Sequence, residues 1–218
     1  MTMEVDAWQR RNAPIGGTTP REFLRNPQRR LRRFIERWIV RERAQDVGSI
    51  LDVAANAGIE AFRLDAAGFR GRYIGIDTNG KALALAQRDL ARPGCVDFVR
   101  AEARRLPFAG GAFDCVLVKD LLEHLDDYRG ALAEAARAAR RWLVVAFFIP
   151  PGRSERLRLH PGGYWLNRYG RREFFRSLAS LGFEVERVKA VYRFWARDQV
   201  VIARRTLVDP PREAKGDS

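Results

Sequence analysis

The stretch Ser49-Ile50-Leu51-Asp52-Val53-Ala54-Ala55-Asn56-Ala57-Gly58 decides the fold of this 218-residue chain. Its first half is apolar apart from Ser49 and Asp52, which is typical of a buried strand. Its second half consists of small residues, so the backbone of this turn can come close to a ligand before the next helical pattern begins. An acid near the end of a strand, followed by a small-residue turn, predicts a ligand site at residues 52–58.

Short apolar runs alternate with helical patterns outward from this stretch. Such alternation predicts a parallel sheet with helices on both faces. Two further strands after residue 182, joined by a loop, predict an antiparallel pair at the end of the sheet. We therefore expect an α/β, Rossmann-like fold with a seven-stranded, mostly parallel sheet and an antiparallel last strand. The expected strands are 49–53, 73–77, 97–100, 113–118, 142–148, 183–191 and 199–204; the expected helices are 58–68, 80–91, 121–125, 129–140 and 171–181, and residues 150–169 are expected to be irregular.

A basic amphipathic helix precedes the sheet. Its apolar residues recur at helical spacing, and arginines occupy the remaining faces. Such a helix can pack on the domain with a solvated basic face, cover a substrate site as a lid, or contact phosphates or lipid headgroups. Its apolar stripe consists of Leu31, Phe34, Ile35, Trp38 and Ile39.

Composition narrows the class of protein. No apolar run is long enough to span a bilayer, and the first 12 residues lack a signal-type apolar stretch, so we expect a cytoplasmic protein. The cysteines, Cys95 and Cys115, are expected to be small buried residues next to strands rather than a disulfide framework. With only two histidines as well, we expect no metal site.

The formal net charge of +13 bears on the choice of partner. A strong basic excess can mark a nucleic-acid or anionic-membrane partner. The arginines are scattered along the chain, however, so we favour a compositional bias over polyanion binding.

Charged residues stand where strands of the predicted sheet end. In an open parallel sheet, ligands bind beyond the carboxyl ends of the strands. Asp77 closes the second strand, and a carboxylate there can accept hydrogen bonds from both hydroxyls of a ribose. Glu102 follows the third strand and could accept from an adenine amine, and Lys119 and Asp120 follow the fourth. We expect the carboxylates of Asp52, Asp77 and Glu102 to converge at one rim of the sheet.

These motifs together resemble the class I S-adenosylmethionine-dependent methyltransferases of the small-molecule, type 11-like branch. The pieces are the acid with its small turn, Gly-Ile-Asp at 75–77, Glu-Ala-x-x-Leu-Pro-Phe at 102–108, Phe-Asp-x-Val at 113–116 and Leu-x-Glu-His-Leu at 121–125. The resemblance covers about residues 48–205. It implies a methyltransferase domain at 46–208, preceded by an N-terminal segment with the basic helix (1–45) and followed by a disordered tail (209–218).

The resemblance also implies S-adenosylmethionine as the cofactor. The turn after the first strand would hold its methionine part, Asp77 its ribose and Glu102 its adenine, while the segment 118–121 would line the region near the methyl group. The residues expected to bind the cofactor are Asp52, Ala54, Asn56, Gly58, Asp77, Thr78, Glu102, Ala103 and Lys119.

The turn departs from the family pattern Gly-x-Gly-x-Gly, because Ala54 and Asn56 replace the first two glycines. Asparagine tolerates a positive φ better than other non-glycine residues, so Asn56 can preserve the backbone path. Ala54 adds a methyl group where the cofactor approaches most closely. Either the variation is tolerated or cofactor binding is weakened, and we expect binding to be retained.

Candidates for general-base catalysis are Asp120, His124, His160 and Tyr164. A base helps an oxygen acceptor more than a neutral amine. For His124 we favour a scaffold role over a catalytic one. His160 lies in the irregular segment at 150–169, where an aromatic and polar cluster can form the wall of an acceptor site or simply pack on itself. The residues of that cluster expected to bind the acceptor are Tyr164, Trp165, Asn167 and Tyr169.

The leading hypothesis is a methyltransferase acting on an oxygen or nitrogen of a small molecule. An RNA-directed methyltransferase would account for the charge, although no appended RNA-binding module is apparent. A domain that has lost its cofactor and acts as a binding protein would account for the altered turn. A nicotinamide-dependent oxidoreductase fits less well, because its glycine-rich turn follows a strand without an acid in the position of Asp52.

Overall fold

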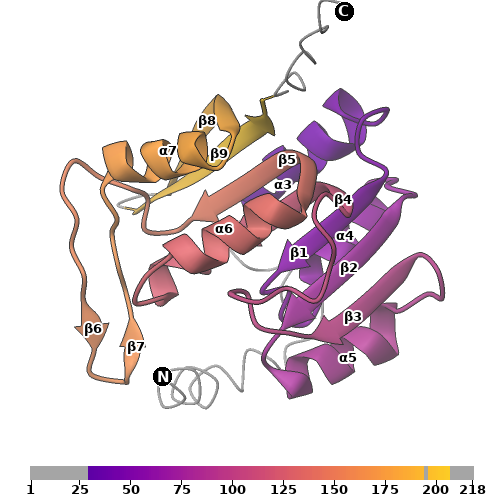
Figure 1. Ribbon diagram of the computed structural model, residues 1–218. Coiled ribbons are helices and arrows are strands. Elements are labelled where there is room, and N and C mark those ends of the chain that lie inside the picture. The colour runs from indigo at the N-terminus through magenta and orange to yellow at the C-terminus, as the bar shows by residue number, and fades with distance from the viewer. Residues whose placement is uncertain (1–28, 194–195, 207–218) are drawn as a thin grey trace, which may run out of the picture.

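Seven strands form one sheet in the order β3-β2-β1-β4-β5-β9-β8. The computed structural model describes residues 29–193 and 196–206 (Figure 1). Strands β1 to β5 run parallel, β9 is antiparallel to β5, and β8 is antiparallel to β9, so only β9 runs against the rest of this sheet. The strands are β1 (Ser49–Val53), β2 (Arg72–Asp77), β3 (Val96–Arg100), β4 (Phe113–Lys119), β5 (Ala139–Phe147), β8 (Phe183–Arg193) and β9 (Ala196–Arg205).

Helices cover both faces of the sheet, as Figure 1 shows. On one face, α6 (Arg129–Ala138) and α7 (Arg171–Ser180) bury an apolar core against the sheet. On the other face, α3 (Arg29–Arg37), α4 (Ile59–Ala66) and α5 (Gly80–Leu90) bury a second one. Strand residues alternate between these cores: Leu51 and Val53 belong to the first, and Ile50 to the second. The predicted α/β, Rossmann-like fold is confirmed.

The basic helix packs on the sheet with its apolar stripe buried. Leu31, Ile35, Trp38 and Ile39 join the core beneath α3 and α4, and Arg33, Arg37 and Arg41 are exposed. After α3 the chain widens into a single π-helical turn, η1 (Trp38–Glu42). Of the alternatives that the sequence left open for this helix, packing on the domain with a basic exposed face is the one observed.

Several element boundaries differ from the sequence expectations. The segment expected to be helical at 121–125 is a 3-10 turn, η2 (Leu122–His124). Strand β5 begins at Ala139 rather than 142, because α6 passes into it directly through an extended residue and needs no glycine turn. The irregular segment contains a short hairpin of β6 (Leu159–His160) and β7 (Tyr164–Trp165). Gly182, with a φ of 77°, lies just beyond α7, where a left-handed residue commonly ends a helix.

Cys115 is buried in β4, as predicted, but the prediction for Cys95 is wrong. Cys95 lies in the turn before β3, where its amide is bonded to the carbonyl of Arg92, and its side chain is exposed. Both cysteines are free. Within the described ranges, no cluster of three or more His, Cys, Asp or Glu side chains is placed to hold a metal ion.

Some expectations lie outside the described residues. These are the organisation of the chain before residue 29 and the disorder of the tail at 209–218. Among the residues that are described, no helix has the length and apolar character needed to cross a bilayer.

Gly75 in β2 offers a test of this packing. A Cβ there would lie 2.7 Å from a ring carbon of Phe98 and 2.8 Å from Cβ of Ala55, both in the interior. We expect Gly75→Ala to lower the free energy of unfolding by about 1–3 kcal/mol, because the core must shift. Gly130→Ala, on α6, is the control. Its Cβ would lie 3.8 Å from Cγ of Arg104, an ordinary contact, so it should raise the free energy of unfolding by about 0.5–1 kcal/mol. Urea unfolding followed by circular dichroism measures both, and equal effects would contradict the prediction.

Candidate functional site

The turn after β1 has a left-handed backbone at every position where the family pattern has glycine. The φ angles are 65° at Ala54, 51° at Asn56 and 74° at Gly58. Non-glycine residues rarely adopt this conformation, and it costs them about 1–2 kcal/mol each. The altered turn therefore keeps the backbone path that glycines would give. The expectation for Asn56 is confirmed, and Ala54 follows the same path.

Asp77 clamps this turn from the end of the neighbouring strand. Its Oδ2 accepts a hydrogen bond from the amide of Asn56 at 2.9 Å, and its Oδ1 accepts one from the amide of Asn79 at 2.8 Å. Burial raises the pKa of Asp77, although the backbone amides of Asn79, Asn56 and Thr78 oppose this. The carboxylate has about four lone pairs, so acceptor capacity remains for a ligand hydroxyl.

Asp52 does not lie at the surface of the rim but in the interior. Its side chain is fully buried; Tyr73 donates to Oδ2 at 2.6 Å, and the Lys119 ammonium lies 3.0 and 3.2 Å from the two oxygens. Burial raises the pKa of Asp52, and Lys119 opposes this rise. The negative charge of the Asp52 carboxylate is thus balanced by the Lys119 ammonium inside the protein.

A second buried acid belongs to the same group of charges. Glu60 on α4 bonds to Arg32 of α3, and one of its oxygens lies 3.7 Å from the Lys119 ammonium. Burial acts to raise the pKa of Glu60, but Lys119, Arg32 and Arg63 together outweigh it and the pKa is lowered. We call Asp52, Glu60, Lys119, Arg32 and Tyr73 the buried charge cluster. It joins β1, β2, β4, α3 and α4 directly beneath the turn.

The segment after β4 begins with another strained residue. Asp120 has a φ of 52°, and its amide donates to the carbonyl of Ala146 at 2.9 Å. Glu123, in η2, is fully buried, and its Oε1 accepts from the amides of Phe148 at 2.9 Å and Ile149 at 3.4 Å. Burial, helped by the charge of Asp120, raises the pKa of Glu123 to about 8. Glu123 thus fixes the segment after β5 to the one after β4.

The structure brings the two histidines to the same aromatic group. The rings of His124 and His160 lie 6.3 and 4.4 Å from that of Tyr164, and the ring of Phe148 lies 5.2 Å from that of His124. His124 Nδ1 lies 2.9 Å from the carbonyl of Trp165. A carbonyl only accepts, so Nδ1 carries the proton and Nε2 is the basic nitrogen when the ring is neutral. Burial lowers the pKa of His124, which favours that neutral form.

His160 has the opposite tautomer. The amide of Gly162 donates to His160 Nδ1 at 3.0 Å, so the neutral ring carries its proton on Nε2. The basic nitrogen of His160 is therefore already engaged by the hairpin.

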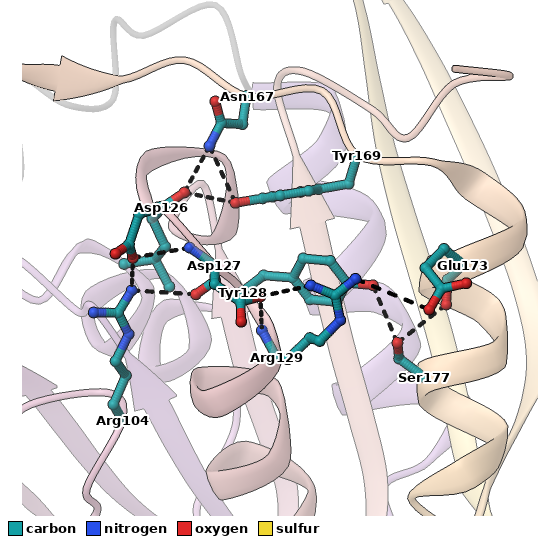
Figure 2. Close-up of polar contacts among 10 residues, drawn as sticks. Arg104, Asp126, Asp127, Tyr128, Arg129, Asn167, Tyr169, Glu173 and Ser177 are labelled. Atoms are coloured by element: carbon teal, nitrogen blue, oxygen red, sulfur yellow. Dashed lines mark hydrogen bonds and ion pairs between the residues drawn. The ribbon is translucent and has the colours of Figure 1, made fainter. Parts of the chain in front are cut away.

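Asn167 and Tyr169, both buried, hold the hairpin onto the domain. Figure 2 shows the two side chains pointing to one carbonyl, that of Leu125, at 2.7 Å from Asn167 Nδ2 and 2.6 Å from the Tyr169 hydroxyl. The Asn167 side-chain oxygen accepts from the amide of Arg158 at 2.8 Å. These contacts serve the scaffold, while Tyr164 and Trp165 are half-buried.

Three further predicted residues lie along the strand ends next to Asp77. Thr78 follows Asp77 and is half-buried. Glu102 is exposed after β3, and Ala103 beside it is packed against the core beneath α6. Because β3 pairs with β2 up to Asp77 and Arg100, these residues share the rim with the turn.

Sequence reasoning missed Glu60, Arg32, Tyr73 and Glu123. One signal was available: Lys119 ends a buried strand directly after the apolar run 115–118, and a buried ammonium requires an acidic partner. Which acid it meets depends on pairing between residues 67 positions apart, which no local pattern encodes.

Comparison with known proteins shows what the chain is similar to. Residues 51–142 match the family described as "Methyltransferase domain". The chain is 32% identical over 109 residues to the ubiquinone/menaquinone biosynthesis C-methyltransferase UbiE of Francisella tularensis subsp. novicida, covering 47% of this chain and 44% of that one. It is 36% identical over 124 residues to the demethylmenaquinone methyltransferase of Thermus thermophilus, covering 53% and 56%. The chain thus spans about half the length of these curated relatives.

Solved structures share the fold. A magnesium protoporphyrin IX methyltransferase from Synechocystis with bound S-adenosylmethionine aligns with a TM-score of 0.67 and 19% identity, over 92% of this chain and 90% of that one. The 1,6-didemethyltoxoflavin-N1-methyltransferase of Burkholderia thailandensis aligns with a TM-score of 0.64 and 21% identity, over 79% and 77%.

The sheet order and these likenesses define the fold of the class I S-adenosylmethionine-dependent methyltransferases. Residues 51–142 of the chain match the model of the methyltransferase-domain family, and the resemblance predicted from the sequence motifs is confirmed.

The buried charge cluster predicts a large effect of removing Lys119. Lys119→Met leaves Asp52 and Glu60 buried without their shared counter-ion, so the free energy of unfolding should fall by about 3–5 kcal/mol. Lys119→Met combined with Asp52→Asn should recover part of this loss. Lys81→Met, at an exposed lysine, is the matched control and should have little effect. Urea unfolding at pH 7 compares them; a Lys119 variant as stable as the Lys81 variant would show that the cluster contributes little.

Glu123 predicts a pH dependence of stability. Its pKa is about 8 in the fold against an ordinary 4.5, so the folded state retains a proton that the unfolded state releases. That contribution is complete below about pH 4.5 and is lost as pH rises toward 8. Between pH 5 and 8.5 the parent protein should lose about 1–3 kcal/mol more stability than Glu123→Gln.

Urea unfolding at several pH values measures this difference, with Glu184→Gln as the control at an exposed glutamate. His124 titrates alike in all three proteins and cancels from the comparison. Parallel pH profiles for the parent and Glu123→Gln would contradict the assignment.

Proposed function

We propose that the protein is an S-adenosylmethionine-dependent methyltransferase that acts on a small molecule. The turn after β1 carries this proposal: Ala54, Asn56 and Gly58 all keep a left-handed backbone, and Asp77 fixes the turn through the Asn56 amide. A strained backbone at two non-glycine residues persists only where the surrounding structure imposes it, and such positions cluster at ligand sites.

The residues present fit this cofactor. The side-chain oxygen of Asn56 is buried and accepts no hydrogen bond within the described part of the chain, so it offers an unused acceptor in the turn. Asp77 has lone pairs for the ribose hydroxyls, and the exposed Glu102 stands two positions beyond the neighbouring strand for the adenine amine. We propose that Ala54, Gly58, Thr78 and Ala103 also line this site, through their backbone or through apolar contacts with the cofactor.

We assign Asp52 and Lys119 a positioning role rather than direct contact with the cofactor. Both are at least nine-tenths buried, and each is the main ionic partner of the other. Since they join the first and fourth strands beneath the turn, they fix the distance between the turn and Asp120. This differs from the direct binding expected from the sequence.

S-adenosylmethionine supplies an electrophilic methyl group, so the protein needs no nucleophile of its own. The work left to this chain is to align the acceptor and exclude water, and orientation alone can supply about 7–11 kcal/mol of the barrier. Where the acceptor must lose a proton, we assign the base to His124, because its tautomer leaves Nε2 basic and its lowered pKa keeps it neutral. Asp120 is the second candidate, and the engaged Nδ1 of His160 makes that residue the weakest.

The acceptor wall consists of Tyr164 and Trp165 in this proposal. Both are half-buried on β7, and Tyr164 faces the histidines. Asn167 and Tyr169, expected from the sequence to contact the acceptor, are assigned instead to holding the hairpin in place.

The acceptor atom can be oxygen, nitrogen or carbon. The sequence suggested oxygen or nitrogen, and the named relatives include C-methyltransferases and an N1-methyltransferase. The preserved geometry of the turn argues against the alternative of a binding protein without cofactor. An RNA substrate and a cytoplasmic location stay predictions.

Calorimetric titration with S-adenosylhomocysteine and S-adenosylmethionine tests the proposal. The parent protein should bind both, and Asp77→Ala should weaken binding at least about tenfold, because the turn loses its clamp and the ribose its acceptor. Asp89→Ala, at an exposed acid on α5, is the control. Failure of the parent to bind either compound would favour the cofactor-free binding protein, and unchanged binding by Asp77→Ala would refute the ribose assignment.

A further inference from the structure

The hairpin segment that follows β5 exposes two large apolar side chains close together in the sequence. The large hydrophobic residues that are exposed in the described part of the chain are Leu157 (52%), Leu159 (52%) and Val188 (42%). Leu157 and Leu159 lie two positions apart in the run 153–159, Arg-Ser-Glu-Arg-Leu-Arg-Leu, in which every residue is exposed. Their neighbours Arg153, Arg156 and Arg158 outnumber the one acid, Glu155, so the run carries a net charge of +2.

The hairpin has two chemically different faces. Side chains alternate across an extended ladder, so Leu157 and Leu159 share one face, with Trp165 opposite Leu159 in the pairing. His160 and Tyr164 are paired on the other face and stack on each other, with Tyr164 near His124. One face thus lies beside His124, and the other carries Leu157, Leu159 and Trp165.

The segment is held firmly although it leaves the domain. Figure 1 shows β6 and β7 at the end of two limbs that depart after β5 and return before α7. Backbone bonds between Arg156 and Arg168 (2.7 and 2.9 Å) join the limbs, and Asn167 anchors them to Leu125. The apolar face is therefore a preformed feature rather than a collapsed loop.

We propose that the exposed run 153–159, along which leucines and arginines alternate and which we call the leucine-arginine face (Arg153, Arg156, Leu157, Arg158, Leu159), docks on an anionic lipid surface. Leucines that enter the interfacial region bury their exposed area, and flanking guanidinium groups reach lipid phosphates. A second copy of the chain would bring like charges of two such faces together. RNA would use the arginines and leave the leucines exposed to water.

Docking here would place the acceptor wall beside the bilayer. An acceptor with a lipid-like body could then pass from the membrane to Tyr164 without crossing bulk water. This last step rests on the proposed methyltransferase function, whereas lipid binding by the face itself does not. The two can be tested separately, because vesicle binding requires no cofactor and no turnover.

Co-sedimentation with vesicles tests the proposal. The full chain should bind vesicles of phosphatidylglycerol and phosphatidylcholine, bind pure phosphatidylcholine vesicles at least about tenfold more weakly, and lose binding as salt rises. Leu157→Ser with Leu159→Ser should reduce partitioning about tenfold. Val188→Ser, which removes the other exposed hydrophobic, is the matched control and should bind like the parent.

A second pair of variants separates this face from the basic helix. Arg153→Gln with Arg156→Gln and Arg158→Gln should weaken binding and flatten its salt dependence. Arg33→Gln with Arg37→Gln and Arg41→Gln removes as many exposed charges from α3 and η1 and should change binding little. Loss of binding in the helix variant alone would overturn the proposal.

Two other outcomes would also overturn it. Binding that depends on the arginines, ignores the leucines and is displaced by RNA would point to a nucleic-acid partner. Light scattering that shows a dimer dissociated by the leucine substitutions would assign the face to self-association. Circular dichroism of each variant confirms that the fold is intact, so that loss of binding is read as loss of the face.

Discussion

The contact between Asp52 and Lys119 is the constraint on which the rest of the site depends. Ionised groups are expensive to bury, and they remain buried only when geometry and further hydrogen bonds compensate. Here Tyr73 bonds the acid, and Glu60 with Arg32 completes the compensation from two helices. The partners come from different elements, so the charges are satisfied only when β1, β4 and the N-terminal helices are all in place. The cluster thus couples the basic helix to the rim that carries the proposed cofactor site.

A strained turn sits directly above this rigid base. Ala54 and Asn56 hold left-handed φ angles that glycine would adopt more easily, and Asp77 bonds the Asn56 amide to hold the path. Asp120, across the rim, has the same kind of backbone. Strain at three positions around one rim requires a surrounding structure that does not relax, and the buried charge cluster provides it. The replacement of two glycines is therefore compatible with an intact site.

Sequence patterns predicted the parts of this architecture that depend on local spacing. The alternation of strands and helices along the chain, the place of Asp77 at the end of a strand and the left-handed Asn56 follow from periodicity and backbone preference. The bond from the Asn56 amide to Asp77 was not expected. The interior ion pairs do not, because Arg32 meets Glu60 and Lys119 meets Asp52 only after the sheet and helices have assembled. The role expected for Asn167 illustrates the same limit: polarity in a loop suggested a substrate contact, whereas tertiary packing turned the side chain onto the carbonyl of Leu125.

The hairpin likewise combines a rigid buried base with side chains that can contact other molecules. Glu123 bonds the amides that follow β5 and accepts, through its own carbonyl, the amide of Asn167, so one buried residue holds both limbs of the hairpin at their base. Beyond this anchor, one face carries the rings beside His124, and the other exposes Leu157 and Leu159. An exposed apolar face on a well-anchored element persists in water only at a cost, and a partner that covers it removes that cost. Because both faces belong to a single two-stranded ladder, whatever the leucines bind is held at a fixed distance from the acceptor wall.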